Sequence, residues 1–212
     1  MKIILVHGWG CHSGVWHKLI PLLGEHDLYP IDLGFVRGGP KGAGELPEDS
    51  LCIGHSFGVM WLLKHGPRPV KGLVSIAGFD CLCKHVPGEV LATMCEGMMT
   101  DPHAQMSAFW DELGLEEDRP NVEDIDGGGL RAGLDWIALW DTGEQLRSLG
   151  APVLALAARN DRVVRKEATE AIWGNGMAEL HWHDTAGHMM QITEPEWCAK
   201  HILAFIDAIE TQ

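Results

Sequence analysis

A five-residue motif with glycine at both ends constrains the fold of this chain more than any other feature of the sequence. The motif Gly54-His55-Ser56-Phe57-Gly58 follows an apolar run at residues 51–53 and precedes a helix-compatible run at residues 59–64. Strand, sharp turn and helix in this order are the context of a nucleophile elbow, in which a strained turn lifts a serine hydroxyl clear of the sheet. The flanking glycines remove side chains that would collide in the turn. The pattern therefore predicts that Ser56 is a nucleophile rather than part of a plain glycine-rich turn.

Short apolar runs alternate with helical patterns along most of the chain. This alternation is typical of an α/β fold in which a mostly parallel sheet is covered by helices on both faces. We expect strands over residues 2–6, 26–33, 51–53, 70–76, 153–157 and 179–183. We expect helices over residues 15–23, 59–64, 130–140, 166–173 and 196–209. Residues 34–49 are rich in Gly and Pro and predict a loop.

The alternation stops between residues 80 and 126, where Met, Trp and acidic residues accumulate without a strand pattern. We interpret residues 80–126 as a helical lid inserted after the fourth strand, and residues 1–79 and 127–212 as the core that carries it. The apolar side chains of this segment favour either an acyl-binding pocket or a separate helical core, and the sequence leaves both open. They are Met94, Met98, Met99, Met106, Phe109 and Trp110.

Composition limits the partners and the compartment. A chain of 212 residues with 46% hydrophobic residues suits one domain. The formal net charge of -14 argues against nucleic acid and anionic membranes as partners. No secretory signal and no membrane-length apolar run is present, so we expect a cytoplasmic monomer whose six cysteines are free thiols. No cofactor is predicted, and two pairs of possible metal ligands lack a third ligand at useful spacing. These pairs are Cys81 with Cys83 and His181 with His183.

The sequence also supplies partners for the serine. A serine hydroxyl becomes a nucleophile when a base takes its proton and an acidic group orients that base. On this architecture the acid and the base follow later strands, in the order Ser, Asp, His. Asp161 follows the fifth expected strand and His188 follows the sixth, so we predict a triad of Ser56, Asp161 and His188. Weaker candidates for the acid are Asp135, Asp141 and Asp184.

The tetrahedral intermediate of acyl transfer needs two hydrogen-bond donors for its oxyanion. One is expected to be the backbone N–H of Phe57, directly after the nucleophile, and the other the N–H of Trp9 in the loop after the first strand. His7 is expected to brace this loop. As substrate-binding residues we select Trp9, Phe57, Phe109 and Trp110.

Several stretches together resemble the α/β-hydrolase superfamily, and most closely its pimeloyl-[acyl-carrier protein] methyl ester esterases of biotin synthesis. They are Val6-His7-Gly8-Trp9-Gly10 with Val15-Trp16, the elbow, Gly127-Gly128-Gly129-Leu130 through Asp135 to Pro152-Val153-Leu154, and Ala186-Gly187-His188 with Glu194-Pro195. The resemblance implies hydrolysis of the methyl ester of a pimeloyl chain carried on acyl carrier protein. Ser56 would attack the ester carbonyl, His188 would protonate the departing methanol, and water activated by His188 would release the acid.

The chain departs from that family at several points. The given sequence begins at the first expected strand, without the hairpin that usually precedes it, no helix is expected between Asp32 and the elbow, and His55 stands where relatives often carry Trp. Carrier protein is acidic and docks on basic side chains, whereas residues 80–126 are strongly acidic. Docking would then use another face, with the basic residues Arg37, Lys41, Lys64, Arg68 and Lys71. Two alternatives stay open: a general carboxylesterase for small short-chain esters, and an inactive hydrolase-like binding protein.

Overall fold

Six parallel strands form one sheet in the order β2-β1-β3-β4-β5-β6 in the computed structural model, which describes residues 1–39, 46–115 and 118–211. The strands are β1 Lys2–Val6, β2 Asp27–Ile31, β3 Leu51–His55, β4 Gly72–Ile76, β5 Val153–Ala158 and β6 Glu179–His183. β3, β4 and β5 are buried along their whole length, because helices cover both faces of the sheet. The predicted α/β class with a mostly parallel sheet is confirmed.

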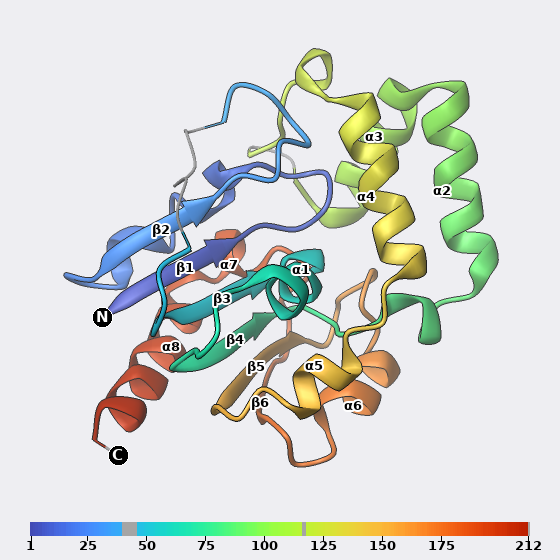
Figure 1. The fold of residues 1–212 in the computed structure, drawn as a ribbon. Coiled ribbons are helices and arrows are strands. Elements are labelled where there is room, and N and C mark those ends of the chain that lie inside the picture. The colour runs from blue at the N-terminus through green and yellow to red at the C-terminus, as the bar shows by residue number, and fades with distance from the viewer. Residues whose placement is uncertain (40–45, 116–117, 212) are drawn as a thin grey trace.

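Helices α1 and α5 lie on one face of the sheet and α7 and α8 on the other (Figure 1). The helices are α1 Phe57–His65, α2 Gly88–Thr100, α3 Pro102–Leu113, α4 Gly127–Leu139, α5 Gly143–Arg147, α6 Lys166–Trp173, α7 Met190–Thr193 and α8 Pro195–Glu210. β2 lies at an edge of the sheet, where Pro30 can be accommodated because one side of an edge strand makes no ladder hydrogen bonds. No helix in the described part of the chain is long and apolar enough to cross a membrane.

The helix predicted over residues 15–23 was wrong. Two short 3₁₀ helices form there instead, η1 Ser13–Trp16 and η2 Ile20–Leu22. A continuous α-helix would need an N–H from Pro21, which proline lacks. The apolar side chains of Val15, Leu19 and Leu23 are nevertheless buried, so the spacing identified the buried face but not the type of helix.

The loop predicted over residues 34–49 is described only in part. Residues 34–39 and 46–49 form no helix, and Val36 makes an isolated antiparallel bridge with Ile125. The remaining positions, including the basic candidate Lys41, lie outside the described residues. The bridge ties the chain after β2 to the segment that precedes α4.

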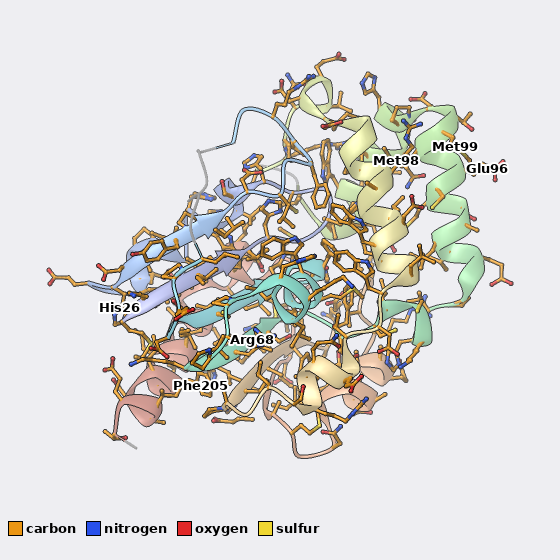
Figure 2. The ribbon with its side chains drawn as sticks, in the orientation of Figure 1. His26, Arg68, Glu96, Met98, Met99 and Phe205 are labelled. Atoms are coloured by element: carbon orange, nitrogen blue, oxygen red, sulfur yellow. The ribbon has the colours of Figure 1, made fainter. Side chains whose placement is uncertain are left out.

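The segment between β4 and α4 is largely helical in its described part. It contains η3 Leu82–Lys84, α2, α3 and η4 Val122–Asp124, and Figure 1 shows α2, α3 and α4 beyond the carboxyl ends of the strands. On α2, Met98 points inward and is 2% exposed, whereas Met99 points outward and is 68% exposed (Figure 2). The role of residues 80–126 as a lid, and their boundaries as a separate unit, stay predictions.

A glycine allows α1 to pass close to β1. A Cβ atom at Gly58 would lie 2.1 Å from the carbonyl oxygen of Val6, and one at Gly54 would lie 2.6 Å from the backbone nitrogen of Val59. Both neighbours are backbone atoms that cannot rotate away. The two glycines of the motif are therefore required for the packing of α1 against the sheet.

We expect the substitution Gly58→Ala to lower the free energy of unfolding by about 3 kcal/mol, because the new methyl group overlaps the backbone of β1. Urea unfolding followed by circular dichroism measures the change. Gly88→Ala is the matched control, since a Cβ there has no atom within 4 Å. That control should stay within about 1 kcal/mol of the wild type. Equal stability of the two variants would contradict the packing argument.

Candidate active site

Ser56 occupies a strained turn between β3 and α1. Its backbone angles are φ 53° and ψ -125°, a conformation that residues with a side chain rarely adopt. Hydrogen bonds hold the turn on both sides: the Ser56 N–H donates to the carbonyl oxygen of Ile76 at 3.0 Å, and the Val59 N–H donates to the carbonyl oxygen of Ser56 at 3.1 Å. The surrounding sheet and helix therefore impose the strain that projects the side chain from the sheet edge.

Asp161 and His188 form a buried pair at the same edge of the sheet. His188 Nδ1 lies 2.8 Å from Asp161 Oδ2, and both side chains are 2% exposed. The other carboxylate oxygen, Oδ1, accepts the N–H groups of Val163 at 2.8 Å and Val164 at 2.9 Å. Because a carboxylate accepts hydrogen bonds, Nδ1 carries the proton and Nε2 of His188 is left as the basic nitrogen.

The other acid candidates are not placed to orient His188. Asp141 pairs with Lys84, and Asp184 pairs with Arg159 at 2.9 Å. Asp135 lies exposed on α4. Among these candidates and Asp161, only Asp161 contacts the imidazole of His188.

The contact between the serine and the histidine is not made directly. Within the described part of the chain the hydroxyl of Ser56 has no hydrogen-bond partner, and Ser56 lines a cavity. The ring of His188 lies 4.9 Å, centroid to centroid, from the ring of His55, which immediately precedes the serine. Catalytic hydrogen bonds are often loose until substrate binds. The structure thus brings Asp161 and His188 together beside the elbow, and the final step to Ser56 stays a prediction.

His55 connects the elbow to the histidine loop, a role that the sequence analysis missed. Its Nε2 lies 3.2 Å from the carbonyl oxygen of His188, so this nitrogen carries a proton and donates it. Its Nδ1 is buried without a partner among the described residues. Burial, followed by repulsion from His188, holds the pKa of His55 well below the ordinary value of a histidine. A neutral His55 therefore ties the backbone of His188 to β3, the strand that leads into the turn at Ser56.

Two unused backbone N–H groups lie near the serine, that of Trp9 in the loop after β1 and that of Phe57 at the start of α1. A Cβ on Gly8 would lie 2.9 Å from Cβ of Ser56, so the loop backbone contacts the elbow directly. The backbone N–H groups of Trp9 and Phe57 make no hydrogen bond among the described residues. Free donors next to a nucleophile are what an oxyanion requires.

His7 and the indole of Trp9 hold this loop. The Leu33 N–H donates to His7 Nε2 at 2.9 Å, which leaves Nδ1 as the protonated nitrogen that donates to the carbonyl oxygen of Gly8 at 2.8 Å. The indole N–H of Trp9 donates to the carbonyl oxygen of Leu130 at 2.8 Å. The predicted bracing role of His7 thus has a definite geometry.

A cavity of about 260 Å³ opens beside Ser56. Its deep end is apolar, with Trp9, Phe79, Leu82, Leu91, Leu134 and Ile137. Its exposed rim consists of Pro87, Val90, Glu112, Arg162 and Arg165. The predicted residues Trp9 and Phe109 line it, as does Met94.

Two of the selected substrate-binding side chains do not line the cavity. Trp110 is fully buried, and its indole N–H donates to the carbonyl oxygen of Gly10 at 2.8 Å. The ring of Phe57 is fully buried and packs against Trp136 and Trp140. Residues 80–126 therefore contribute both to the cavity wall and to a helical core, and Met106 is buried with the latter.

The possible metal ligands form no metal centre. Cys81 and Cys83 bring their sulfur atoms to 3.3 Å, and His181 lies 2.6 Å from Glu179. In residues 1–39, 46–115 and 118–211, no group of three or more His, Cys, Asp or Glu side chains is arranged to hold a metal ion.

Comparison with known proteins gives relatives along nearly the whole chain. No model of a protein family matches it. A pimeloyl-[acyl-carrier protein] methyl ester esterase from Yersinia pseudotuberculosis serotype IB (strain PB1/+) is 26% identical, and the alignment covers 97% of this chain and 93% of the relative. The protein of the same name from Klebsiella pneumoniae (strain 342) is 26% identical over 95% of this chain and 92% of its own length.

Solved structures resemble the fold. An esterase from Exiguobacterium antarcticum matches with a TM-score of 0.79 and 16% identity, over 98% of this chain and 92% of that one. A bromoperoxidase from Bacillus anthracis matches with a TM-score of 0.79 and 15% identity, over 97% and 91%. The chain therefore has the α/β-hydrolase fold, as the sequence resemblance implied.

The strain at Ser56 leads to a stability prediction. Ser56→Gly should be more stable than Ser56→Ala by about 1 kcal/mol, because glycine relieves the unfavourable backbone angles and alanine does not, even after the entropic cost of glycine. Thermal and urea unfolding of the two variants measure the difference. An alanine variant at least as stable as the glycine variant would show that the turn is unstrained.

His55 leads to a pH prediction. A histidine whose pKa is lowered on folding binds fewer protons in the folded than in the unfolded state, so stability falls as the pH drops below about 6.5, the unfolded value. Because Gln does not titrate, the free energy of unfolding of His55→Gln should fall less steeply as the pH drops, by up to about 1.4 kcal/mol per pH unit. Urea unfolding at pH 5, 6 and 7 measures both slopes. Identical slopes for the wild type and the variant would mean that His55 is not held neutral.

Proposed function

We propose that this α/β-hydrolase is a serine carboxylic ester hydrolase that cleaves the methyl ester of a pimeloyl chain carried on acyl carrier protein, a reaction of biotin synthesis. The observation that carries the proposal is the buried pair of Asp161 and His188 at the sheet edge where the strained Ser56 lines a cavity. The names of the sequence relatives and of the esterase among the structural neighbours support the hydrolase class. The relatives alone support the choice of ester.

The proposed first half-reaction forms an acyl-enzyme. Nε2 of His188 takes the proton of the Ser56 hydroxyl while Oγ attacks the ester carbonyl, and Asp161 stabilises the imidazolium that forms. The tetrahedral intermediate collapses as His188 returns the proton to the methoxy oxygen. The bond between the acyl carbon and the methoxy oxygen breaks, and methanol leaves.

The second half-reaction repeats these steps with water. His188 takes a proton from water, the hydroxide adds to the acyl carbonyl, and the bond to Ser56 Oγ breaks as His188 returns the proton to it. The products are the free carboxylic acid and the regenerated enzyme. The backbone N–H groups of Trp9 and Phe57 would bind the oxyanion in both halves, and losing one such donor typically lowers turnover by about 10²–10³-fold.

The cavity fits the acyl half of such an ester. A chain of methylene groups gains from contact with apolar side chains, by about 0.8 kcal/mol for each buried methylene. Leu82, Leu91, Leu134 and Ile137 supply such a wall and carry no charge. The cavity would therefore hold the acyl chain, with the ester carbonyl at Ser56 and the remote end of the chain at the rim.

A general short-chain carboxylesterase is the second candidate. The volume of about 260 Å³ favours it, since it lies just below the range of about 300–1,000 Å³ that is usual for ligand sites. The inactive binding protein is disfavoured, because the strain at Ser56 and the buried Asp161–His188 pair are costly features that simple binding does not require.

Hydrolysis of the two substrates separates these candidates. The wild type is expected to release methanol from pimeloyl methyl ester on acyl carrier protein and to cleave p-nitrophenyl butyrate. Ser56→Ala should lower kcat on both by at least about 10⁴-fold, because the nucleophile is lost. Ser107→Ala on α3 is the matched control and should keep the wild-type rates. Cleavage of p-nitrophenyl butyrate alone would favour the general esterase.

Growth of a biotin auxotroph that lacks its methyl esterase tests the same proposal in the cell. Rescue by the wild-type gene and not by Ser56→Ala is the expected result. A well-expressed wild-type protein that fails to restore growth would count against the role in biotin synthesis.

A further inference from the structure

The rim of the cavity has two differently charged sides. On one side Arg162 and Arg165 belong to the loop between β5 and α6. On the other side Val90 and Glu112 belong to α2 and α3. An ester whose acyl chain fills the cavity and whose remote end is attached to a protein must cross this rim. The charge of each side therefore decides which way the attached protein lies.

The two rim arginines differ from the cations beside them in the sequence. Arg159 pairs with Asp184 at 2.9 Å, and Lys166 pairs with Glu170 at 3.5 Å. Arg162 and Arg165 are both exposed, and neither has a carboxylate within 4.0 Å among the described residues. In a chain with a formal net charge of -14, two unpaired cations at the mouth of the candidate site are a local exception to the overall field.

The loop that carries the arginines is held in place by the candidate site itself. Asp161 Oδ1 accepts the N–H groups of Val163 and Val164, and Asp161 Oδ2 binds His188. Arg162 follows Asp161 directly, and Arg165 follows Val164. The backbone of the two arginines is thus fixed relative to the Asp161–His188 pair, so a partner bound to them would be fixed relative to the cavity.

The basic face selected from the sequence does not have these properties. The guanidinium of Arg68 donates to the carbonyl oxygens of Leu63 at 2.9 Å and Pro67 at 2.7 Å, and Figure 2 shows it far from the α2–α4 end of the molecule. The guanidinium of Arg37 donates to the carbonyl oxygen of Glu123 at 3.4 Å. The ammonium of Lys64 lies over the ring of Trp140, 4.7 Å from its centroid. Neither these residues nor Lys71 line the cavity.

The helices on the opposite side would repel an acidic protein. A shallow groove continues from the cavity between α2 and α3, and its charged residues are Glu89 and Glu112. Like charges at an interface cost affinity and suppress binding in the wrong orientation. An acidic carrier is therefore excluded from the outer side of α2 and α3 and attracted to the loop between β5 and α6.

We propose that Arg162 and Arg165 form the docking point of an acidic acyl carrier protein, which places the remote end of its acyl chain at the rim of the cavity. This proposal rests on the proposed function, since it needs a substrate attached to a carrier. The docking proposal adds a claim that the proposed function does not make. The partner lies against the loop between β5 and α6, not against the helices of residues 80–126 and not on the face of Lys64, Arg68 and Lys71.

Charge reversal of both arginines tests the docking point. For Arg162→Glu/Arg165→Glu, the ratio of kcat/KM on the carrier-bound pimeloyl methyl ester to kcat/KM on p-nitrophenyl butyrate should fall at least tenfold. The main change should be a higher KM for the carrier-bound ester. In the wild type this KM should also rise with added NaCl, and the double variant should lose most of that dependence, because salt screens charge attraction.

The matched control changes the net charge equally at positions away from the rim. Lys2 begins β1 and Lys200 lies on α8, and both are exposed without an ion pair among the described residues. Lys2→Glu/Lys200→Glu should keep the wild-type ratio. An equal fall in both double variants would show a general charge effect and overturn the docking point.

The remaining outcomes separate the two proposals. If the wild type cleaves the carrier-bound ester and the arginine variant keeps the wild-type ratio and salt dependence, the docking point is wrong and the proposed function stands. If the wild type does not cleave the carrier-bound ester, the proposed function fails, and the docking point fails with it. Circular dichroism spectra and unfolding curves of all variants confirm that each protein folds.

Discussion

The close approach of α1 to β1 at the end of β3 is the constraint on which both the fold and the candidate site depend. Gly54 and Gly58 leave room for backbone against backbone, and Ser56 between them takes backbone angles that sheet and helix impose on it. If α1 were displaced, Ser56 could relax, and the N–H of Phe57, which is proposed to bind the oxyanion, would move with the helix. The same turn therefore determines both the packing of α1 against β1 and the conformation of Ser56.

A second constraint joins loops that are far apart in the sequence. Asp161 holds its own loop through Val163 and Val164 and holds His188 through Nδ1, while His55 holds the carbonyl of His188 from the strand that leads to Ser56. Apart from Val163, which is partly buried, these groups are buried, so their hydrogen bonds act in a medium of low polarity, where an unsatisfied group would be costly. His55 can serve in this way only as a neutral ring, and its burial keeps it neutral.

Features that depend on local pattern and chain order could be predicted from the sequence. Buried parallel strands are continuous apolar runs, and the elbow has glycines at fixed positions, so both leave a signal that needs no knowledge of contacts. Asp161 and His188 could be selected because parallel strands end at one edge of a sheet. Their mutual contact follows from that rule and from the order of the strands.

Features that depend on three-dimensional contacts could not be predicted. The apolar spacing at residues 15–23 identified a buried face, but Pro21 decided the type of helix. Trp110 and Phe109 are neighbours in the sequence, and only the packing of α3 sends one into the core and the other to the cavity. The rim arginines are ordinary surface residues in the sequence, and their place beside the cavity appears only when β5 and α2 are brought together. The sequence resemblance places His55 where relatives often carry Trp, but it does not indicate the hydrogen bond from His55 to the carbonyl oxygen of His188.

Two tryptophan indoles attach the loop after β1 to the helices above the sheet: Trp9 donates to Leu130 on α4, and Trp110 on α3 donates to Gly10. The peptide N–H of Trp9 therefore cannot keep its position if α3 and α4 swing outward as a rigid flap. Entry of a large substrate by such a swing would displace one of the two N–H groups proposed to bind the oxyanion, and only the return of both helices would restore its position. Substrate entry and the position of the Trp9 N–H would then be coupled through the indole hydrogen bonds of Trp9 and Trp110.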